Sequence, residues 1–376
     1  MAGAEEAGIG AALAGMEALF GGFYEWLAGQ YDEASGGFFY ARSSRLLPGF
    51  EPDIESSAQA LSVLERSGLL PLLDPGRRAA MAAFFRARQD PVSGLFLDRD
   101  PAMREDQVMV ARAMQYSLRS LALLGSGPAH PLPPPEAAPS FMASPGSYVA
   151  WLRGVDLRNA WRGCDLMMSA NHYLERLGPA ERERFVGAAR ACFEEMQEPA
   201  SGLWGGGPPY VRLSGAFKMG MFYSRFELPL PRPGALYRSL LGCLRSEEAQ
   251  DLCWVRNPVD LLASLRGLVA APRGELAEAL GITARNLARF LRPDGGFSRE
   301  LRGSPPAPNV AQVKEGEEYP AMPAPVRLGA GLAEGDMNAG TQALLIFRLA
   351  GVLAGTGPAV PGGSGAFLAR LGRRGP

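Results

Sequence analysis

The chain has few of the residues that hold metal ions or act as nucleophiles. Its 376 residues include four cysteines and two histidines. The cysteines are Cys164, Cys192, Cys243 and Cys253, and the histidines are His130 and His172. None of them has the close spacing of metal ligands, so we expect buried free thiols, no metal site and no cofactor.

A charge excess of one sign is also absent. The net charge is -1 and 20% of the residues are charged, so nothing in the composition attracts nucleic acid. The first residues include Glu5 and Glu6, and they lack a basic region and a small-residue cleavage site behind an apolar core. Charges and glycines interrupt the apolar runs well short of a membrane span. We expect a cytoplasmic protein without a transmembrane segment, which acts on a small molecule; the oligomeric state stays open.

Lysine is nearly missing as well. The 38 basic residues include only two lysines, Lys218 and Lys314. Lys218 lies in an almost uncharged stretch, 214–223. Because a buried ammonium group is costly unless it is paired, we expect Lys218 to contact a carboxylate of the chain or an anionic ligand. A structural pair with Asp156 or Glu55 is the alternative.

One feature that the chain has in abundance is a short turn. Four segments place an acidic residue before a glycine and an aromatic ring: 32–38, 90–96, 198–204 and 293–297. A run with helical periodicity precedes each of them. Their spacing is near one or two multiples of roughly 50 residues, the length of a helical hairpin with its loops. The pattern predicts about six such hairpins.

Two kinds of helix alternate along the chain. Amphipathic runs cover 9–30, 76–89, 179–197, 236–247 and 274–291. Runs that are apolar or small almost all round cover 56–64, 108–124, 160–174, 215–222, 259–268 and 339–353. Helices without a polar face must be surrounded by protein. We therefore predict an all-α fold, an (α/α)6 toroid with an outer and an inner ring of helices. It forms one domain over residues 1–376, with proline-rich insert loops near 128–145 and 303–335.

The starts of the inner helices gather polar groups. Segments 52–61 and 335–344 align so that Asp53 corresponds to Asp336 and Glu55 to Asn338. The other inner helices open near Asp106, Asp156, Asn159, Lys218 and Asn257. If all inner helices point the same way, these groups converge on one opening of the ring, as in a ligand pocket. Ordinary helix capping is the alternative for each residue.

Two of the turns carry a recognisable motif. Gln89-Asp-Pro-Val-Ser-Gly-Leu-Phe96 and Gln197-Glu-Pro-Ala-Ser-Gly-Leu-Trp204 resemble the QW motif of the terpenoid cyclase and protein prenyltransferase superfamily. Pro293-Asp-Gly-Gly-Phe297 is similar to the shorter prenyltransferase form. The resemblance covers most of the chain. Since the motif is structural in that superfamily, it implies the α/α toroid rather than an activity.

A second resemblance concerns chemistry. Asp53-Ile-Glu-Ser-Ser-Ala58 is similar to the Asp-x-Asp-Asp-Thr-Ala motif of class II terpene cyclases, with Glu55 at the position of the protonating acid and Ser56 in place of the next aspartate. The resemblance implies acid-initiated cyclisation or isomerisation of an isoprenoid, with Glu55, Asp53 and Asp336 as catalytic residues. Lys218 and Arg225 would then hold an anionic group of the substrate. The cavity wall would comprise Trp161, Phe217, Phe222 and Tyr223.

Two other functions fit the same residues. A glycoside hydrolase or polysaccharide lyase on an α/α toroid would use paired carboxylates as acid and base. The available acids are Asp53, Glu55, Asp106, Asp156 and Asp336. A toroid that binds a ligand without catalysis is the second alternative, in which segment 303–335 would cover the opening.

Overall fold

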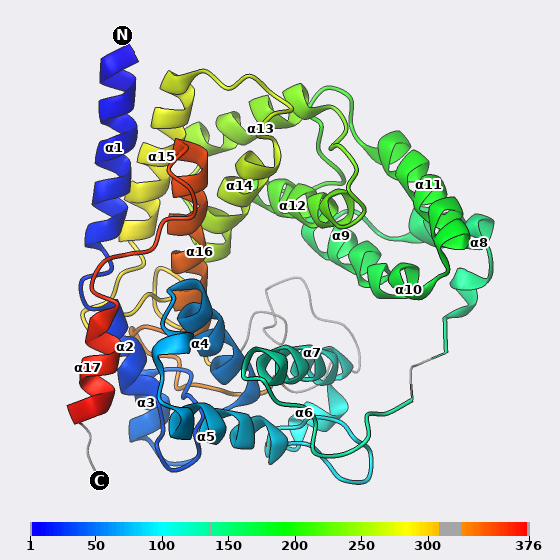
Figure 1. Ribbon diagram of the computed structural model, residues 1–376. Coiled ribbons are helices and arrows are strands. Elements are labelled where there is room, and N and C mark those ends of the chain that lie inside the picture. The colour runs from blue at the N-terminus through cyan, green and yellow to red at the C-terminus, as the bar shows by residue number, and fades with distance from the viewer. Residues whose placement is uncertain (1, 135–136, 308–324, 374–376) are drawn as a thin grey trace. The chain divides into compact units, whose positions relative to one another are not determined.

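The computed structural model describes residues 2–134, 137–307 and 325–373. Within these ranges its regular secondary structure is helical, and strand-like pairing is limited to isolated β-bridges (Figure 1). The predicted all-α class is confirmed. The helix pattern follows from apolar residues spaced to cover one face, with polar caps at the helix starts.

Every amphipathic run forms helix. These helices are α1 (Ala2–Ala18), α2 (Phe23–Gln30), α5 (Pro75–Arg86), α11 (Pro179–Met196), α13 (Pro233–Ser246) and α15 (Arg273–Ala288). Three of them, α5, α11 and α13, begin with a proline. Proline suits this first helical position, because its fixed backbone angle is already helical and its missing N–H would have no partner there.

The apolar runs also form helices. They are α4 (Ile54–Arg66), α7 (Gln107–Leu123), α9 (Ala160–Ser169), α10 (Asn171–Arg176), α12 (Pro209–Arg225), α14 (Leu252–Ser264) and α16 (Met337–Ala354). Polar side chains cap most of their starts by accepting hydrogen bonds from free backbone N–H groups. The capping residues are Asp53, Asp106, Asn159, Asp251 and Asp336.

Several short elements were not predicted from the sequence. They are α3 (Arg42–Leu46), η1 (Leu70–Leu72), α6 (Ala102–Glu105), η2 (Ser140–Ala143), α8 (Pro145–Gly154) and α17 (Gly365–Arg373). The predicted insert loop near 128–145 therefore contains a helical turn, and residues 135–136 lie outside the described ranges. Of the loop predicted at 303–335, residues 308–324 lie outside them, and the described ends carry no helix.

The chain divides into two compact units. The first unit comprises 1–13, 135–286 and 348–359, and the second comprises 14–134, 287–347 and 360–376. In the first unit α12 packs against α9 and α14, while α8 packs against α11. In the second unit α4 packs against α7, and α2 packs against α17. The Thr341 hydroxyl of α16 donates to the Gln59 carbonyl of α4 at 3.4 Å, so three apolar helices adjoin there.

The four turns share one hydrogen-bond pattern. In each, the backbone N–H of the first residue donates to a carbonyl on the other side of the turn. The N–H of a glycine in the turn donates to the carbonyl of that first residue. The pairs are Asp32 with Gly37, Asp90 with Leu95, Glu198 with Leu203 and Arg292 with Gly296, and the returning donors are Gly36, Gly94, Gly202 and Gly295. Gly94 has φ +72, and a Cβ there would lie 2.2 Å from the Pro131 carbonyl oxygen. Only glycine meets both demands.

The glutamines of the two QW-like segments connect a turn to a later segment. The Gln89 amide donates to the Gly94 carbonyl at 3.1 Å and to the His130 carbonyl at 2.9 Å. Gln197 makes the same pair of bonds, to Gly202 at 2.7 Å and Pro231 at 3.0 Å. Both glutamines are buried. The motif therefore has a structural role in this chain.

Among the described residues, two helical stretches are long and apolar enough to cross a membrane by length and composition alone. They are 3–30 and 337–354, and 33% and 61% of their most apolar windows are buried inside the protein. Core helices of soluble proteins meet the same criteria, as do amino-terminal signal sequences.

Candidate functional site

Three residues of the second unit follow their turns at one shared position. Tyr40, Asp98 and Arg299 each lie two residues after the aromatic residue of a turn. Antiparallel bridges give the three segments the same register, since they pair Tyr31 with Phe38, Gln89 with Phe96 and Leu291 with Phe297. Tyr40 and Arg299 are buried, and the Asp98 side chain is 11% exposed. The repeated turn thus places a polar side chain in the protein interior at each of these three positions.

Several charges act on the Tyr40 phenol. Burial raises the pKa of Tyr40 well above its ordinary value, and the negative charge of Asp336 raises it further. Arg299 lowers this pKa, whereas Glu55 and Asp53 add to the rise. The Tyr40 hydroxyl donates to the Pro305 carbonyl at 3.1 Å. Tyr40 also adjoins the start of α16, because the Met337 N–H donates to the Tyr40 carbonyl at 2.8 Å.

Asp53 has one engaged oxygen and one unengaged oxygen. The side chain is 3% exposed and caps α4, where Oδ1 accepts the Ser56 N–H at 2.7 Å. Oδ2 is buried without a hydrogen-bond partner in the described part of the chain. Burial and the charge of Asp98 raise the pKa of Asp53 well above its ordinary value, against the opposing hydrogen bond from the Ser56 N–H. Asp53 therefore keeps its proton to a higher pH than an ordinary aspartic acid.

Asp98 is the charged neighbour of Asp53. Both of its oxygens accept from the Ile54 N–H, at 3.1 and 3.2 Å, and Oδ1 also accepts from Arg88 Nε at 3.0 Å. Burial raises the pKa of Asp98 to about 6, although the Arg88 guanidinium opposes the rise. At neutral pH Asp98 is consequently ionised for most of the time, beside a carboxyl group that resists ionisation.

Arg88 fixes the geometry of this pair. Its Nη2 donates to the Pro52 carbonyl at 2.5 Å, next to Asp53 in the chain. Its guanidinium lies over the Phe84 ring, 3.7 Å from the centroid. The Arg88 side chain is only 13% exposed. These contacts allow little movement of the group that carries the positive charge.

A pocket of about 330 Å³ opens at Asp53 and Asp98. Its remaining walls are both charged and apolar, and they comprise Gly49, Phe50, Glu51, Arg99, Asp100, Pro101, Val326, Arg327 and Leu328. All of these residues belong to the second unit. The pocket combines an apolar wall with convergent polar groups, as ligand sites do.

Glu55 belongs to a separate network between α4 and α7. Its Oε1 accepts from Arg112 Nη2 at 2.6 Å and from Gln59 Nε2 at 3.1 Å. Arg112 Nη2 also donates to the Tyr116 hydroxyl at 3.0 Å. The Glu55 carboxylate is therefore an acceptor in an ion pair, and it is not among the residues that line the Asp53 pocket.

The other predicted acids of the second unit act as caps. Asp336 Oδ1 accepts from the Ala339 N–H at 2.7 Å, and Oδ2 accepts from the Ser304 hydroxyl at 2.8 Å and the Arg299 N–H at 2.9 Å. Burial raises the pKa of Asp336 to about 6 against these hydrogen bonds. Asp106 caps α7 through the N–H groups of residues 108 and 109. Asn338 is buried, and its Oδ1 has no partner in the described part of the chain.

The remaining predicted residues lie in the first unit. Lys218 forms an ion pair with Asp165 of α9, with Nζ and Oδ1 2.6 Å apart, so its partner is neither Asp156 nor Glu55. Asp156 instead pairs with the neighbouring Arg158 on the surface, which lowers the pKa of Asp156.

The polar groups predicted at the helix starts of the first unit make local contacts, and Asn257 lies inside α14 rather than at its start. Asn159 caps α9 through the Arg162 N–H, and the buried Asn257 donates to the Ser214 hydroxyl at 3.0 Å. Arg225, near the end of α12, forms an ion pair with Glu175. The contacts of Asn257 and Arg225 join neighbouring helices within the unit.

The residues predicted to form the cavity wall lie in two different environments. Phe222 and Tyr223 are fully buried, and Phe222 lies edge-on to Phe193 of α11 with 5.0 Å between ring centroids. They are part of a helix–helix core. Phe217 lies under the Arg256 guanidinium at 4.6 Å, and Trp161 is half-buried beside the Arg162 guanidinium at 5.4 Å.

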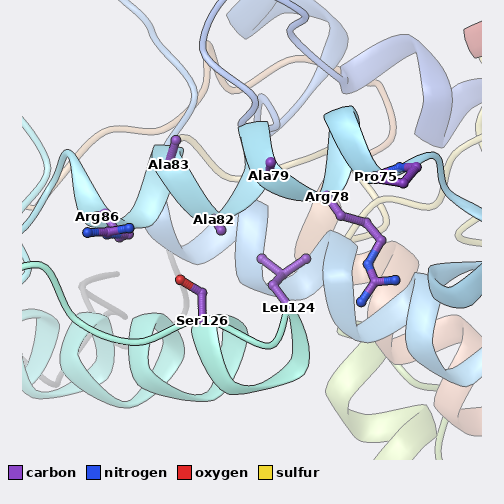
Figure 2. Close-up of a pocket in the computed structure, with 8 residues that line it drawn as sticks. All are labelled: Pro75, Arg78, Ala79, Ala82, Ala83, Arg86, Leu124 and Ser126. Atoms are coloured by element: carbon purple, nitrogen blue, oxygen red, sulfur yellow. The ribbon is translucent and has the colours of Figure 1, made fainter.

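A second pocket lies on the surface of α5, also in the second unit. It has a volume of about 370 Å³ and is lined by α5 and by residues that follow α7 (Figure 2). None of the residues predicted to form a site line it. The residues that line this pocket are Pro75, Arg78, Ala79, Ala82, Ala83, Arg86, Leu124 and Ser126.

Metal ligands are not assembled in the described ranges, where no group of three or more His, Cys, Asp and Glu side chains could hold an ion. The thiols of Cys164, Cys192 and Cys243 are buried and free, and Cys253 is half-buried. No protein-family model matches the chain, and no curated protein matches it. The geometry of the Asp53 pocket is therefore the main guide to function.

Asp98, Arg88 and Tyr40 are the residues of this site that sequence reasoning missed as catalytic candidates. A signal for two of them was present in the sequence. Tyr40 and Asp98 stand two residues beyond a turn aromatic, and the four-fold turn could have directed attention to that position. Arg88 directly precedes the motif glutamine Gln89.

Proposed function

We propose that the chain is an enzyme in which the protonated Asp53 carboxyl group donates a proton to a substrate in the pocket beside it. The observation that carries this proposal is the buried Asp53 Oδ2, which has no partner in the described part of the chain and belongs to a residue that lines the pocket. A general acid must stay protonated until it is used. The burial of Asp53 and the nearby charge of Asp98 meet this need.

The ionised Asp98 would have a complementary role in this reaction. When Asp53 gives up its proton, two carboxylates face the substrate. Negative charge at this place stabilises a cation that forms on the substrate. Arg88 holds Asp98 in position and limits the rise in its pKa. The pair therefore suits reactions in which proton transfer creates positive charge on carbon.

We propose an (α/α)6 toroid as the architecture that carries the site. Within the second unit, α16 adjoins α4 and α4 adjoins α7. Within the first unit, α9, α12 and α14 adjoin in the order of the chain. A Cβ on Gly295 in the last turn would lie 2.7 Å from the Gly22 carbonyl, just before α2. Both residues lie in the second unit, where the last turn therefore packs against the first hairpin, as a ring of hairpins would require.

The substrate class proposed first is an isoprenoid. Protonation of an alkene or epoxide yields a carbocation, which the Asp53 and Asp98 pair would stabilise. The resemblance of segment 53–58 to the class II cyclase motif supports this class. The acid, however, is assigned to Asp53 rather than Glu55, because Glu55 is held in an ion pair with Arg112.

A glycan is the second candidate substrate, and the different pKa values of Asp53 and Asp98 favour it. Glycosidases place a protonated and an ionised carboxyl group on either side of the bond that they cleave. The polar wall of the pocket, with Glu51, Asp100 and Arg99, would suit hydroxyl groups.

An activity screen of the protein and of two variants tests the proposal. Linear polyprenes and prenyl diphosphates form one substrate group, and neutral and uronate oligosaccharides form the other. Asp53→Asn keeps a cap for α4 but cannot donate the proton, so we expect turnover to fall by at least about 100-fold. Asp251→Asn makes the same change at the cap of α14 in the first unit and should keep full activity.

The variant Glu55→Gln separates the two acid assignments. If Asp53 is the acid, Glu55→Gln should retain measurable turnover. Loss of activity in Glu55→Gln together with full activity in Asp53→Asn would refute the assignment. Turnover of oligosaccharides alone would establish the second substrate class.

A further inference from the structure

Two arginines line the α5 pocket, and neither has a partner among the described residues. Within the described ranges, neither the Arg78 guanidinium nor the Arg86 guanidinium makes a hydrogen bond or an ion pair. Arg78 is half-buried, and its Nε is inaccessible to solvent and unpartnered there. Nearby Arg77, by contrast, forms ion pairs with Glu33 and Asp74. The two pocket arginines are therefore available to a ligand.

The wall between the two arginines is apolar and shallow. Ala79, Ala82 and Ala83 supply it from α5, and Leu124 faces them from beyond the end of α7. In Figure 2, Arg78 and Arg86 project near opposite ends of the α5 segment, and the Ser126 hydroxyl points toward α5 between them. Eight residues of α-helix separate the two arginine backbones by roughly 12 Å. Small side chains leave room for a molecule along this length.

We propose that the α5 pocket binds an elongated organic anion that has an acidic group at each end and an apolar middle. The guanidinium groups of Arg78 and Arg86 would each bind one acidic group, since planar guanidinium donors match carboxylate or phosphate oxygens. The hydrocarbon would cover the alanines and Leu124, and Ser126 would donate one further hydrogen bond. The volume of about 370 Å³ is in the range of small-molecule sites. This site is separate from Asp53, and its existence does not depend on the proposed catalytic function.

Calorimetric titration with α,ω-dicarboxylates tests this assignment. The probes are dicarboxylates with chains of about 6 to 12 carbons, whose extended lengths lie on both sides of the roughly 12 Å that separates the arginine backbones. A monocarboxylate and inorganic phosphate serve as comparisons. We expect an optimum chain length, and weaker binding of the monocarboxylate and of phosphate. Equal affinity for phosphate would overturn the claim that the ligand is elongated and would indicate a simple anion site.

Three variants and one control variant link the binding to this pocket. Arg78→Ala and Arg86→Ala should each weaken binding about ten-fold, the effect of one lost charged hydrogen bond. Arg119→Ala removes the same charge from a surface pair with Glu65 in the same unit and should leave binding unchanged. Ala79→Leu fills the pocket from α5 and should abolish binding while the helix persists. No binding by the unaltered protein, or equal losses in Arg119→Ala and Arg78→Ala, would overturn the proposal.

Discussion

Asp53 and Asp336 occupy equivalent positions, but only one of them has an unengaged carboxyl oxygen. The N–H of each donates to the carbonyl of a turn aromatic, Phe38 at 3.3 Å and Phe297 at 2.8 Å. Both side chains cap the next helix through Oδ1. Oδ2 of Asp336 then accepts two hydrogen bonds, whereas Oδ2 of Asp53 has none in the described part of the chain. The same local structure thus produces a cap at one place and a candidate acid at the other.

Asp336 should make stability depend on pH. Its pKa is raised by burial to about 6 from 3.8. The unfolded chain therefore releases this proton more readily than the folded protein does, and stability falls as pH rises from about 4 to about 6. The difference amounts to about 3 kcal/mol. Urea unfolding of the protein and of Asp336→Asn across this range should show a flatter dependence in the variant. An identical dependence in both proteins would contradict the pKa shift.

Close backbone contact should make Gly94 more sensitive to substitution than Gly125. Gly94 and Gly125 have φ values of +72 and +69, but a Cβ on Gly94 would meet Pro131 while one on Gly125 would meet nothing within 4 Å. Gly125→Ala should cost about 1 kcal/mol, the cost of a left-handed conformation. Gly94→Ala should cost several kcal/mol more, because backbone must also move. Thermal unfolding of the two variants measures the difference. Equal losses would mean that the turn at Gly94 does not pack against Pro131.

Arg88 should control the charge of Asp98. Its guanidinium lowers the pKa of Asp98, which burial raises to about 6. Replacement of Arg88 by Met should therefore raise the pKa of Asp98 above 6, so that Asp98 is largely protonated at neutral pH. Arg88→Lys should keep most of the effect. Carbon-detected NMR titration of the Asp98 carboxyl group reports the pKa directly, without any substrate. An unchanged pKa in Arg88→Met would show that Arg88 does not act on Asp98.

The sequence predicted most of the helices, but it did not predict how neighbouring helices are rotated about their own axes. Periodic apolar residues indicated all the major helices except α8 and α17, because burial on one face is a local pattern. Helix α8 was missed, since prolines and glycines around 145 favoured a loop. The partner of Lys218 is Asp165 on an adjacent helix. Such a contact depends on how two helices are rotated about their axes, which no local pattern specifies.

The candidate site was only partly predictable for the same reason. Asp53 could be identified from its position before an apolar helix. Its distinctive property, however, depends on Asp98, which lies in a later turn of the chain. The two come together because Asp98 accepts the Ile54 N–H, at the first residue of α4. Glu55 and Asp53 are two residues apart in the sequence, yet α4 directs Glu55 to Arg112 on α7. Their different roles become apparent only from the packing.

The protonation state of Asp53 tests the central claim most directly. NMR titration of the aspartate carboxyl carbons between about pH 3 and pH 9, with Asp53→Asn to assign the signal, measures it without knowledge of the substrate. We predict that Asp53 titrates well above the range of an ordinary aspartic acid, because burial and Asp98 both raise its pKa. Titration of Asp53 near pH 4, as in an ordinary helix cap, would contradict the proposal that it is a general acid.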